Sequence, residues 1–381
     1  MKRRIFNADH EAFRASVREF VDRHIVPNEE RLIAQRHIDR EIWLEAGRNG
    51  YLGLDVPEEY GGSAAGDYRF NVVLGEELAR SSAAAASGFG IHFDCVAPYL
   101  VKLTNEEQKR RWLPKFCSGE LISAIAMTEP SGGSDLAALK TAAVKDGDGY
   151  VINGSKTFIT NGVQADLVIV AARTTPEKKS KGITLFAVEA STAGFTRGRK
   201  LDKVGQPEAD TAELFFDNVR VEQANIIGQL DQGFIHMMTM LPRERISCSI
   251  ANLGHTRRIF EETVAYARQR NAFGQSIGSM QWNKFLLAEM LTKLDVAQAF
   301  VDECVTVHNT GDLRAVDAAK AKFWSSEIQN EILDHCVQMH GGYGFMNEHR
   351  VARAWKDARV TKIWAGSNEI MREVISRDLA L

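Results

Sequence analysis

Apolar residues recur at helical spacing through the first part of the chain. Five of them would share one face of a first helix: Ala12, Ala15, Val17, Phe20 and Val21. Asp9 is expected to cap that helix at its N-terminus. Thr104-Asn105-Glu106-Glu107 has the order of a capping box and predicts a second, basic amphipathic helix. The pattern therefore predicts a helical region over residues 1–120.

Short apolar runs separated by turn residues replace this pattern from residue 121 to residue 229. The runs cover residues 167–170, 183–188 and 212–216 and are rich in residues that favour strands. Hairpin-type turns are expected at three places: Asp146-Gly147-Asp148-Gly149, Asn153-Gly154 and Asn161-Gly162. Turns this frequent favour an antiparallel, barrel-like sheet over a parallel one.

Helical periodicity returns from residue 230 to the end of the chain. Two long segments, 281–308 and 312–340, keep it without a proline, which is typical of a helical bundle. We therefore expect a mainly α protein with three domains: a helical domain over 1–120, a central β domain over 121–229 and a helical bundle over 230–381. Seams between helical layers and a sheet domain are places where a flat cofactor would fit.

Length and composition agree with this division. The chain has 381 residues, 44% hydrophobic and 25% charged, which suits a globular protein of more than one domain. With 47 basic and 50 acidic residues the formal net charge is -3, so neither nucleic acid nor an anionic membrane surface is an expected partner. The sequence contains no apolar stretch long enough to predict a membrane span, and its basic start lacks the apolar segment of a signal peptide.

The cysteines indicate a reducing compartment. There are five, far apart in sequence and without a CxxC pair, so neither a disulfide framework nor a zinc site is expected. His335, Cys336 and His340 lie near one another, but their spacing does not place all three on one helical face, and no metal is expected there. Reduced thiols in the cytoplasm are the simplest interpretation.

Two segments of the β region combine residues that suit a ligand. The loop 127–135 holds small and hydroxyl residues whose backbone N–H groups would approach an anion or a cofactor edge, unless it is only a tight surface turn. In the segment 153–162, Phe158 and Thr160 are expected on one side of a strand. They would pack against a planar ring and hydrogen-bond its edge, although a phenylalanine in the protein core is the commoner case.

Three further segments lie in the C-terminal region. Arg270, near a helix end and followed by Gln281, would hold a phosphate or simply face solvent. Three glycines within 341–344 interrupt a helical pattern and imply close backbone approach to another group. In the segment 363–371, Ser367 or Asn368 would cap the last helix.

Together, the segments MTEPSGGSD, NGSKTFITNG, RxxFG with Gln281, QMHGGYGF and AGSNEIMRE resemble the acyl-CoA dehydrogenase family in order and spacing over essentially the whole chain. That family consists of FAD enzymes that introduce a 2,3-double bond into acyl-CoA thioesters. The resemblance implies an N-terminal helical domain, a central β domain and a C-terminal four-helix bundle. It also implies an electron-transfer flavoprotein as the acceptor and a homotetramer, a dimer of dimers.

The resemblance assigns roles by position. The flavin side of the site would be contacted by Met127, Thr128, Gly133, Ser134, Phe158 and Thr160. The adenosine diphosphate part of FAD would be contacted, in the family across a subunit interface, by Arg270, Phe273, Gln281, Gln338, Gly341 and Gly342, and FAD also by Ser367 and Asn368. Substrate contacts are implied for Ser134, Arg245 and Gly366. Phe158 stands where many members have tryptophan, which keeps a smaller ring contact.

The catalytic base is displaced from its commonest place in the family. The reaction needs a carboxylate to remove the α-proton, and many members carry a Glu immediately before the Gly-Thr or Gly-Ser pair of the last loop. Here that position is Ala365, which offers only its backbone N–H. A backbone donor can still polarise the thioester oxygen, so the position is expected to keep that part of its role.

Glu244 is the expected replacement. It lies in the largely apolar segment 233–254, where partial desolvation would raise its pKa and the adjacent Arg243 and Arg245 would oppose the rise. The residues alone favour a surface salt bridge. The long-chain and isovaleryl branches of the family carry the base on this helix, and the long-chain branch has a similar LPxER segment, so the resemblance implies that Glu244 is the base.

The sequence therefore predicts an FAD-dependent acyl-CoA dehydrogenase of fatty acid β-oxidation, acting on a long-chain or branched substrate because Ala365 leaves room near the acyl channel. One alternative is an acyl-CoA oxidase or monooxygenase-like relative that uses dioxygen. Another is a non-catalytic acyl-CoA- or flavin-binding homologue that lost the carboxylate at Ala365.

Overall fold

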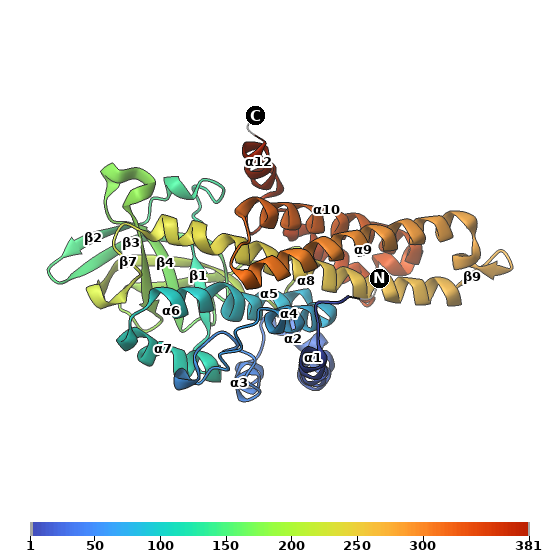
Figure 1. Ribbon diagram of the computed structural model, residues 1–381, viewed down its shortest axis with the longest axis horizontal. Coiled ribbons are helices and arrows are strands. Elements are labelled where there is room, and N and C mark those ends of the chain that lie inside the picture. The colour runs from blue at the N-terminus through green and yellow to red at the C-terminus, as the bar shows by residue number, and fades with distance from the viewer. Residues whose placement is uncertain (1–2, 380–381) are drawn as a thin grey trace.

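Seven helices form the N-terminal part of the computed structural model, which describes residues 3–379 (Figure 1). They are α1 (Ala8–Phe20), α2 (Glu29–Gln35), α3 (Arg40–Arg48), α4 (Arg69–Ser81), α5 (Ala83–Gly90), α6 (Ala97–Leu103) and α7 (Glu106–Ser118). A π-helical segment, Ile91–Val96, joins α5 to α6 without a break in the chain direction. The helical N-terminal region predicted from the apolar spacing is present.

The helix starts differ by one or two residues from the expected caps. Asn7, rather than Asp9, caps α1 and accepts a hydrogen bond from the backbone N–H of His10. Asn105 caps α7 and forms a capping box with Gln108. In both helices an asparagine carbonyl satisfies a backbone donor of the first turn, and acidic residues follow where they favour the positive end of the helix dipole.

The central domain is one eight-stranded sheet with the order β6-β7-β3-β2-β4-β5-β8, and β1 pairs with β4. The strands are β1 (Ser123–Ala126), β2 (Ala142–Asp146), β3 (Gly149–Thr160), β4 (Leu167–Arg173), β5 (Ile183–Glu189), β6 (Phe195–Lys200), β7 (Thr211–Glu222) and β8 (Ile226–Ile227). Most neighbours are antiparallel, as expected, but β1 and β2 both pair with β4 in parallel. Turn residues predict pairing only between strands that are neighbours in sequence, so they could not predict these parallel pairs between distant strands.

β4 is buried on both faces, which explains its uninterrupted apolar sequence. Leu167 and Ile169 pack into a core shared with α6 and α7. Val168 and Val170, one position on, face the core formed by the other side of the sheet. The sheet is therefore covered by helices on one side and folded over its own core on the other.

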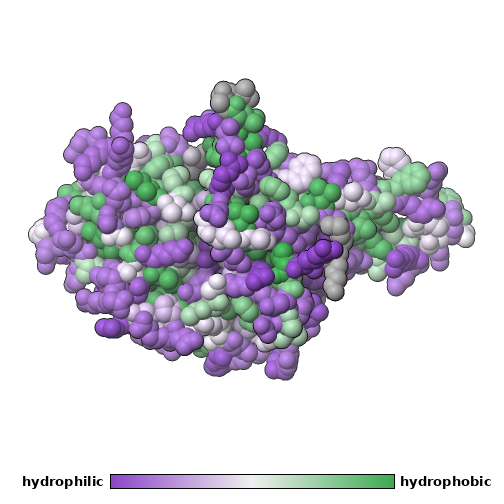
Figure 2. Space-filling model, in the orientation of Figure 1, coloured by the Kyte–Doolittle hydropathy of each residue, from purple (hydrophilic) through white to green (hydrophobic). Residues whose placement is uncertain are grey.

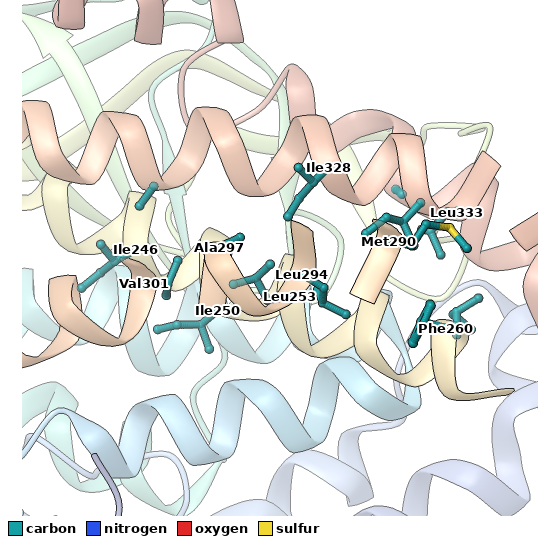
Figure 3. Packing of buried hydrophobic residues seen from close by; sticks show 14 of the residues in the cluster. Ile246, Ile250, Leu253, Phe260, Met290, Leu294, Ala297, Val301, Ile328 and Leu333 are labelled. Carbon is teal, nitrogen blue, oxygen red and sulfur yellow. The ribbon is translucent and has the colours of Figure 1, made fainter. Parts of the chain in front are cut away.

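The C-terminal part is a bundle of long helices. Its elements are α8 (Gly233–Gln269), β9 (Asn271–Ala272), β10 (Gln275–Ser276), α9 (Gln281–Thr310), α10 (Ala315–His340), α11 (Arg350–Ala358) and α12 (Asn368–Asp378). The helices α8, α9 and α10 run along the long axis of the molecule, with the sheet at one end and the β9–β10 hairpin at the other (Figure 1). Figure 3 shows their shared core, in which Ile246, Leu294 and Ile328 lie between the helices.

α8 connects all three parts of the protein. Its first residue, Gly233, packs so closely on β5 that an added Cβ would lie 2.9 Å from the Ile183 carbonyl oxygen. Further along, α8 packs against α4 and α10. None of the helices described here is long and apolar enough to cross a membrane.

Candidate active site

Glu244 lies on α8 in a buried setting, with 9% of its surface exposed. The hydroxyl of Tyr99, on α6, donates a hydrogen bond of 3.2 Å to its Oε1. Burial raises the pKa of Glu244 to about 7, the Tyr99 hydrogen bond and the charge of Arg245 oppose that rise, and Asp94 adds to it. A carboxyl group that is about half ionised near neutral pH has the character of a general base.

The two arginines beside Glu244 have different surroundings. Arg243 turns away: its Nε donates to Asp94 Oδ1 at 2.7 Å, it pairs with Asp55, and it lies 4.8 Å from the centre of the Tyr68 ring. Its charge is therefore balanced by two carboxylates. The sequence interpretation, in which both arginines lower the pKa of Glu244, is wrong for Arg243, because the charge that opposes the rise is that of Arg245.

Arg245 points toward the last loop of the chain. Only 6% of it is exposed, and its Nε has no hydrogen-bond partner among the described residues. A Cβ added to Gly366 would lie 3.9 Å from its Nη2. Since a buried guanidinium without an acceptor is costly, this group is suited to an oxygen or anion of a ligand. The predicted substrate residues Arg245 and Gly366 are thus brought together.

The loop from Ala365 to Asn368 has an unusual backbone. Ala365 and Gly366 both adopt positive φ, 51° and 87°. Within the described part of the chain, no acceptor takes the Ala365 N–H. Ser367 caps α12, and the Asn368 side chain is buried beneath the loop. The free N–H at Ala365 is the donor that the sequence predicts for the thioester oxygen.

A buried ion pair fixes the loop that follows β1. Lys156 of β3, with no exposed surface, donates to Glu129 Oε1 at 2.9 Å and to the Met127 carbonyl at 3.0 Å. Burial lowers the pKa of Lys156 to about 8. Burial alone would raise the pKa of Glu129, but the backbone N–H of Lys140 and the Lys156 ammonium lower it to about 2. The loop that carries Met127 and Thr128 is therefore held against β3.

The same loop and strand present the other predicted flavin contacts. Thr128 accepts a hydrogen bond of 3.0 Å from the Thr157 N–H, and an added Cβ at Gly133 would lie 3.2 Å from Thr128. Phe158 has φ of 60° and is 68% exposed, beside a register shift between Lys156 and Ile159. This bulge turns the ring outward, so simple strand alternation does not describe it. Ser134 is exposed and Thr160 is half-buried nearby.

The remaining predicted cofactor residues lie at the far end of the bundle. Arg270 caps the end of α8, Phe273 is 95% exposed in the β9–β10 turn, and Gln281 begins α9. Gln338 is near the end of α10, and Gly341 and Gly342 follow it with open space at each Cβ position. The Tyr266 ring stacks on His340 at 4.3 Å, which joins the ends of α8 and α10.

Within one chain, this second group does not meet Glu244. Arg270 follows Glu244 by 26 positions on α8, which is about 39 Å along a helix axis. The β9 end of the bundle also lies opposite the sheet in Figure 1. The predicted cofactor residues thus lie apart: one cluster is on the sheet and another is at the bundle end, while Ser367 and Asn368 lie at the start of α12.

Both clusters have features that fit a planar nucleotide ligand. Each contains an exposed phenylalanine at positive φ, Phe158 or Phe273. An exposed ring in a strained conformation is expected where a ligand or partner covers it. Arg270 adds a cation, and the open glycines let a phosphate approach the backbone. Among the described residues no cluster of His, Cys, Asp and Glu has the geometry of a metal site.

Sequence reasoning missed Tyr99 and Lys322. Tyr99 is separated from Glu244 by 145 positions, and no local pattern links the two. Lys322 lies in an apolar stretch of α10, and its ammonium contacts the Gly366 carbonyl. Glu129 and Lys156 lie within two of the motifs, MTEPSGGSD and NGSKTFITNG. Their opposite charges could have indicated that these two segments pair.

Three family profiles match the chain in order. The acyl-CoA dehydrogenase N-terminal domain matches residues 7–120, the middle domain residues 124–219 and the C-terminal domain residues 231–380. The long-chain specific acyl-CoA dehydrogenase, mitochondrial, of Sus scrofa is 43% identical over 379 residues, which are 99% of this chain and 88% of that protein.

Solved structures are similar over the whole fold. An acyl-CoA dehydrogenase from Geobacillus kaustophilus has a TM-score of 0.98 and 43% identity, with 100% of both chains covered. An acyl-CoA dehydrogenase from Bacillus anthracis complexed with FAD has a TM-score of 0.93 and 30% identity, covering 98% of this chain and 67% of that chain.

Proposed function

The chain belongs to the acyl-CoA dehydrogenase family, and we propose that it oxidises a long-chain or branched acyl-CoA to the trans-2-enoyl-CoA, with Glu244 as the base. The family's enzymes are FAD-dependent oxidoreductases. The observation that carries the proposal is the buried Glu244, whose pKa is about 7, beside an unpaired Arg245 and the free N–H of Ala365.

The chain's own residues divide the reaction between them. Glu244 takes the α-proton onto a carboxylate oxygen, and Tyr99 keeps that oxygen in place. The Ala365 N–H, with the adjacent Arg245, donates to the thioester oxygen as negative charge develops there. FAD, when bound, supplies the acceptor for the hydride that leaves the β-carbon as the double bond forms.

The substrate assignment follows from the loop and from the relative. Ala365 has a methyl group where a carboxylate side chain is common in the family, which leaves volume beside the acyl chain. The similar Sus scrofa protein is named for long-chain substrates. An enzyme of this kind would catalyse the oxidation that opens fatty acid β-oxidation and pass its electrons to an electron-transfer flavoprotein. The cysteine pattern supports a cytoplasmic enzyme.

The separated clusters support an oligomer. A second copy would bring Arg270, Phe273 and the 338–342 segment to the site around Glu244, as a homotetramer built as a dimer of dimers allows. The exposed aromatic residues of α9, Trp282 at 77% and Phe285 at 63%, would then be covered.

An anaerobic titration with short, long and branched acyl-CoA thioesters tests the proposal. We expect a long-chain or branched thioester to bleach the flavin of the wild-type protein. Glu244→Gln should keep its FAD but slow flavin reduction by ~10²- to 10⁴-fold, the usual contribution of a general base. Glu261→Gln, an exposed carboxylate on the same helix, is the control and should behave as wild type.

Two results would contradict the proposal. Reduction of Glu244→Gln at the native rate would remove Glu244 from the base role. A bound flavin that no thioester bleaches would favour a non-catalytic binding protein. Rapid reoxidation of the reduced, product-bound flavin by air would instead identify an oxidase.

A further inference from the structure

A lysine is buried beneath the loop that carries Ala365. Lys322 lies on α10, and none of its surface is exposed. Its ammonium donates to the Gly366 carbonyl at 2.7 Å and to Asn368 Oδ1 at 2.9 Å. No carboxylate of the described residues lies within ion-pair distance of it, so both of these acceptors are neutral. Burying a cation against neutral acceptors costs free energy that an apolar side chain would not.

The surroundings show how costly this ammonium is. Burial, together with the nearby charge of Arg245, lowers the pKa of Lys322 to about 8. Two cations therefore converge on one loop, Lys322 from below and Arg245 near Gly366. Packing alone does not require that arrangement, because a methionine would fill a similar volume without the desolvation cost.

The loop needs an external anchor. Ala365 at φ of 51° is strained, since a residue with a Cβ disfavours this region. Upstream, the Val360 carbonyl accepts from the N–H groups of Ile363 and Trp364 at 2.8 and 3.1 Å. Downstream, the first fixed points are the two groups that Lys322 holds. The Ala365 peptide lies between these anchors.

The downstream anchor is itself rigid. The Asn368 amide nitrogen donates to Ser326 Oγ at 2.9 Å and to Glu327 Oε1 at 2.8 Å. Ser326 and Glu327 follow Lys322 by about one turn of α10, so a single helical turn holds the start of α12. Lys322, Ser326 and Glu327 together hold the Gly366 carbonyl and the Asn368 side chain at the downstream end of the loop.

We propose that Lys322 is a positioning residue, whose ammonium holds the 365–368 loop so that the Ala365 N–H points at the thioester oxygen. This inference rests on the proposed function, because it assigns that N–H to the substrate carbonyl. It explains how the loop keeps its donor geometry although the family's usual glutamate is absent from it. Lys322 itself touches neither substrate nor the reacting atoms.

The test measures the polarisation of a bound carbonyl. Trans-2-hexadecenoyl-CoA, isotope-labelled at the thioester carbonyl, is bound to FAD-loaded wild type, and the infrared carbonyl frequency is compared with that in water. A donated hydrogen bond lowers this frequency. In Lys322→Met we expect the lowering to be largely lost while FAD content stays at the wild-type level. Lys320→Met, the same change at a more exposed position on the same helix, should keep it.

Kinetics give the second readout. The rate of flavin reduction in Lys322→Met should fall by a factor on the order of 10 to 100, as expected for a misplaced oxyanion donor, with thioester affinity almost unchanged. The Gln side chain in Lys322→Gln is shorter and uncharged and cannot reach both the Gly366 carbonyl and Asn368 Oδ1. Lys322→Gln should therefore show the same changes, and it replaces Lys322→Met in the test if that variant does not fold. A native carbonyl frequency and native rate in a folded Lys322 variant would overturn the proposal.

The two proposals fail in different ways. If no thioester reduces the wild-type flavin, the proposed function fails, whereas the carbonyl frequency still judges the Lys322 assignment. If the wild type is reduced normally and the variants polarise the carbonyl as the wild type does, the function stands and the positioning role is wrong.

Discussion

At the residue scale, the properties of Glu244 come from contacts that the linear sequence does not contain. The apolar neighbours on α8 and the vacancy at Ala365 made it a candidate base. The sequence also placed two arginines beside it, which would keep a surface carboxylate ionised. The fold separates these charges, because Asp94 and Asp55 engage Arg243 and leave Arg245 at the site. Burial then decides the pKa of Glu244.

Tyr99 would set the pH at which Glu244, as the proposed base, works. Its hydroxyl donates to Glu244 and so favours the ionised carboxylate, which lowers the pKa from the value that burial alone would give. In Tyr99→Phe the donor is lost and the pKa of Glu244 rises. Because the base must be ionised, the acid limb of the kcat/KM profile should move to higher pH.

The matched control for that profile is Tyr51→Phe. Tyr51 is equally buried, and its hydroxyl contacts Ser16 at 2.8 Å, away from Glu244. Its profile should coincide with that of wild type. An acid limb that stays in place in Tyr99→Phe would show that the hydrogen bond is absent from the working enzyme.

Glu244 is also expected to destabilise the folded protein at neutral pH. Between pH 4.5 and about 7 the folded state holds the Glu244 proton more tightly than the unfolded state does. The free energy of unfolding therefore falls as pH rises through this window, by about 3 kcal/mol in total. Glu244→Gln carries no such group. We expect it to melt at the wild-type temperature at pH 4.5 and clearly above it at pH 8, with FAD saturating in both. A wild type that melts at or above the temperature of Glu244→Gln at pH 8 would contradict this sign.

At the element scale, local patterns identified most elements but misjudged two of the three hairpin turns. Asn161-Gly162 forms a turn, but it leads from β3 to β4, which do not pair with each other. Both long helices of the bundle and the hairpin at 146–149 are confirmed. Asn153-Gly154 instead lies inside β3, as a bulge where a Cβ on Gly154 would come within 2.6 Å of Thr141. The same dipeptide suits a turn or a bulge, and only its partner strand decides. The parallel pairing of β1 with β4 depends on distant partners in the same way.

The ion pair of Glu129 and Lys156 joins two elements that the sequence treats separately. Both side chains are almost fully buried, at 4% and 0% exposed. Removing one partner leaves a buried charge, so Glu129→Gln and Lys156→Met should each destabilise the protein, by roughly 3–5 kcal/mol at most. They should also reduce FAD content, because the loop with Met127 and Thr128 loosens.

The double variant separates the pair from its surroundings. With both charges removed, Glu129→Gln/Lys156→Met should lose less stability than the sum of the single variants, as measured by thermal unfolding. Lys293→Met, which breaks surface pairs with Glu289 and Glu331, should have almost no effect. Additive losses for the double variant would mean that the two side chains act independently.

At the scale of the whole molecule, the fold is extended rather than rounded around its site. Figure 2 shows hydrophobic residues at the surface of the projecting bundle, among charged ones. Phe273, Trp282, Phe285 and Phe345 are strongly exposed aromatic residues at this end of the bundle. The sequence motifs predicted members of a cofactor site but no distances, so they could not show that one chain holds these residues in two separate clusters.

Subunit complementation tests whether two chains share each cofactor site. In the proposed roles, Glu244→Gln disables the base of its own site, and Arg270→Ala weakens a cofactor contact at the bundle end. Suppose that Arg270 contacts the cofactor bound in the partner's site. A mixed pair, with one chain of each variant, then has one site that combines an unchanged Glu244 from one chain with an unchanged Arg270 from the other. Its second site carries both defects.

Co-expressed, differently tagged variants should therefore regain activity that neither has alone at limiting FAD. Random pairing makes half of the pairs mixed, so activity should approach roughly a quarter of the wild-type value. Pairing Glu244→Gln with Glu244→Gln/Arg270→Ala leaves no intact base and should regain none. If Arg270 served its own chain, each site of a mixed pair would keep one defect and activity would stay at the level of the single variants. Restored activity thus requires the two clusters, about 39 Å apart along α8, to meet between chains.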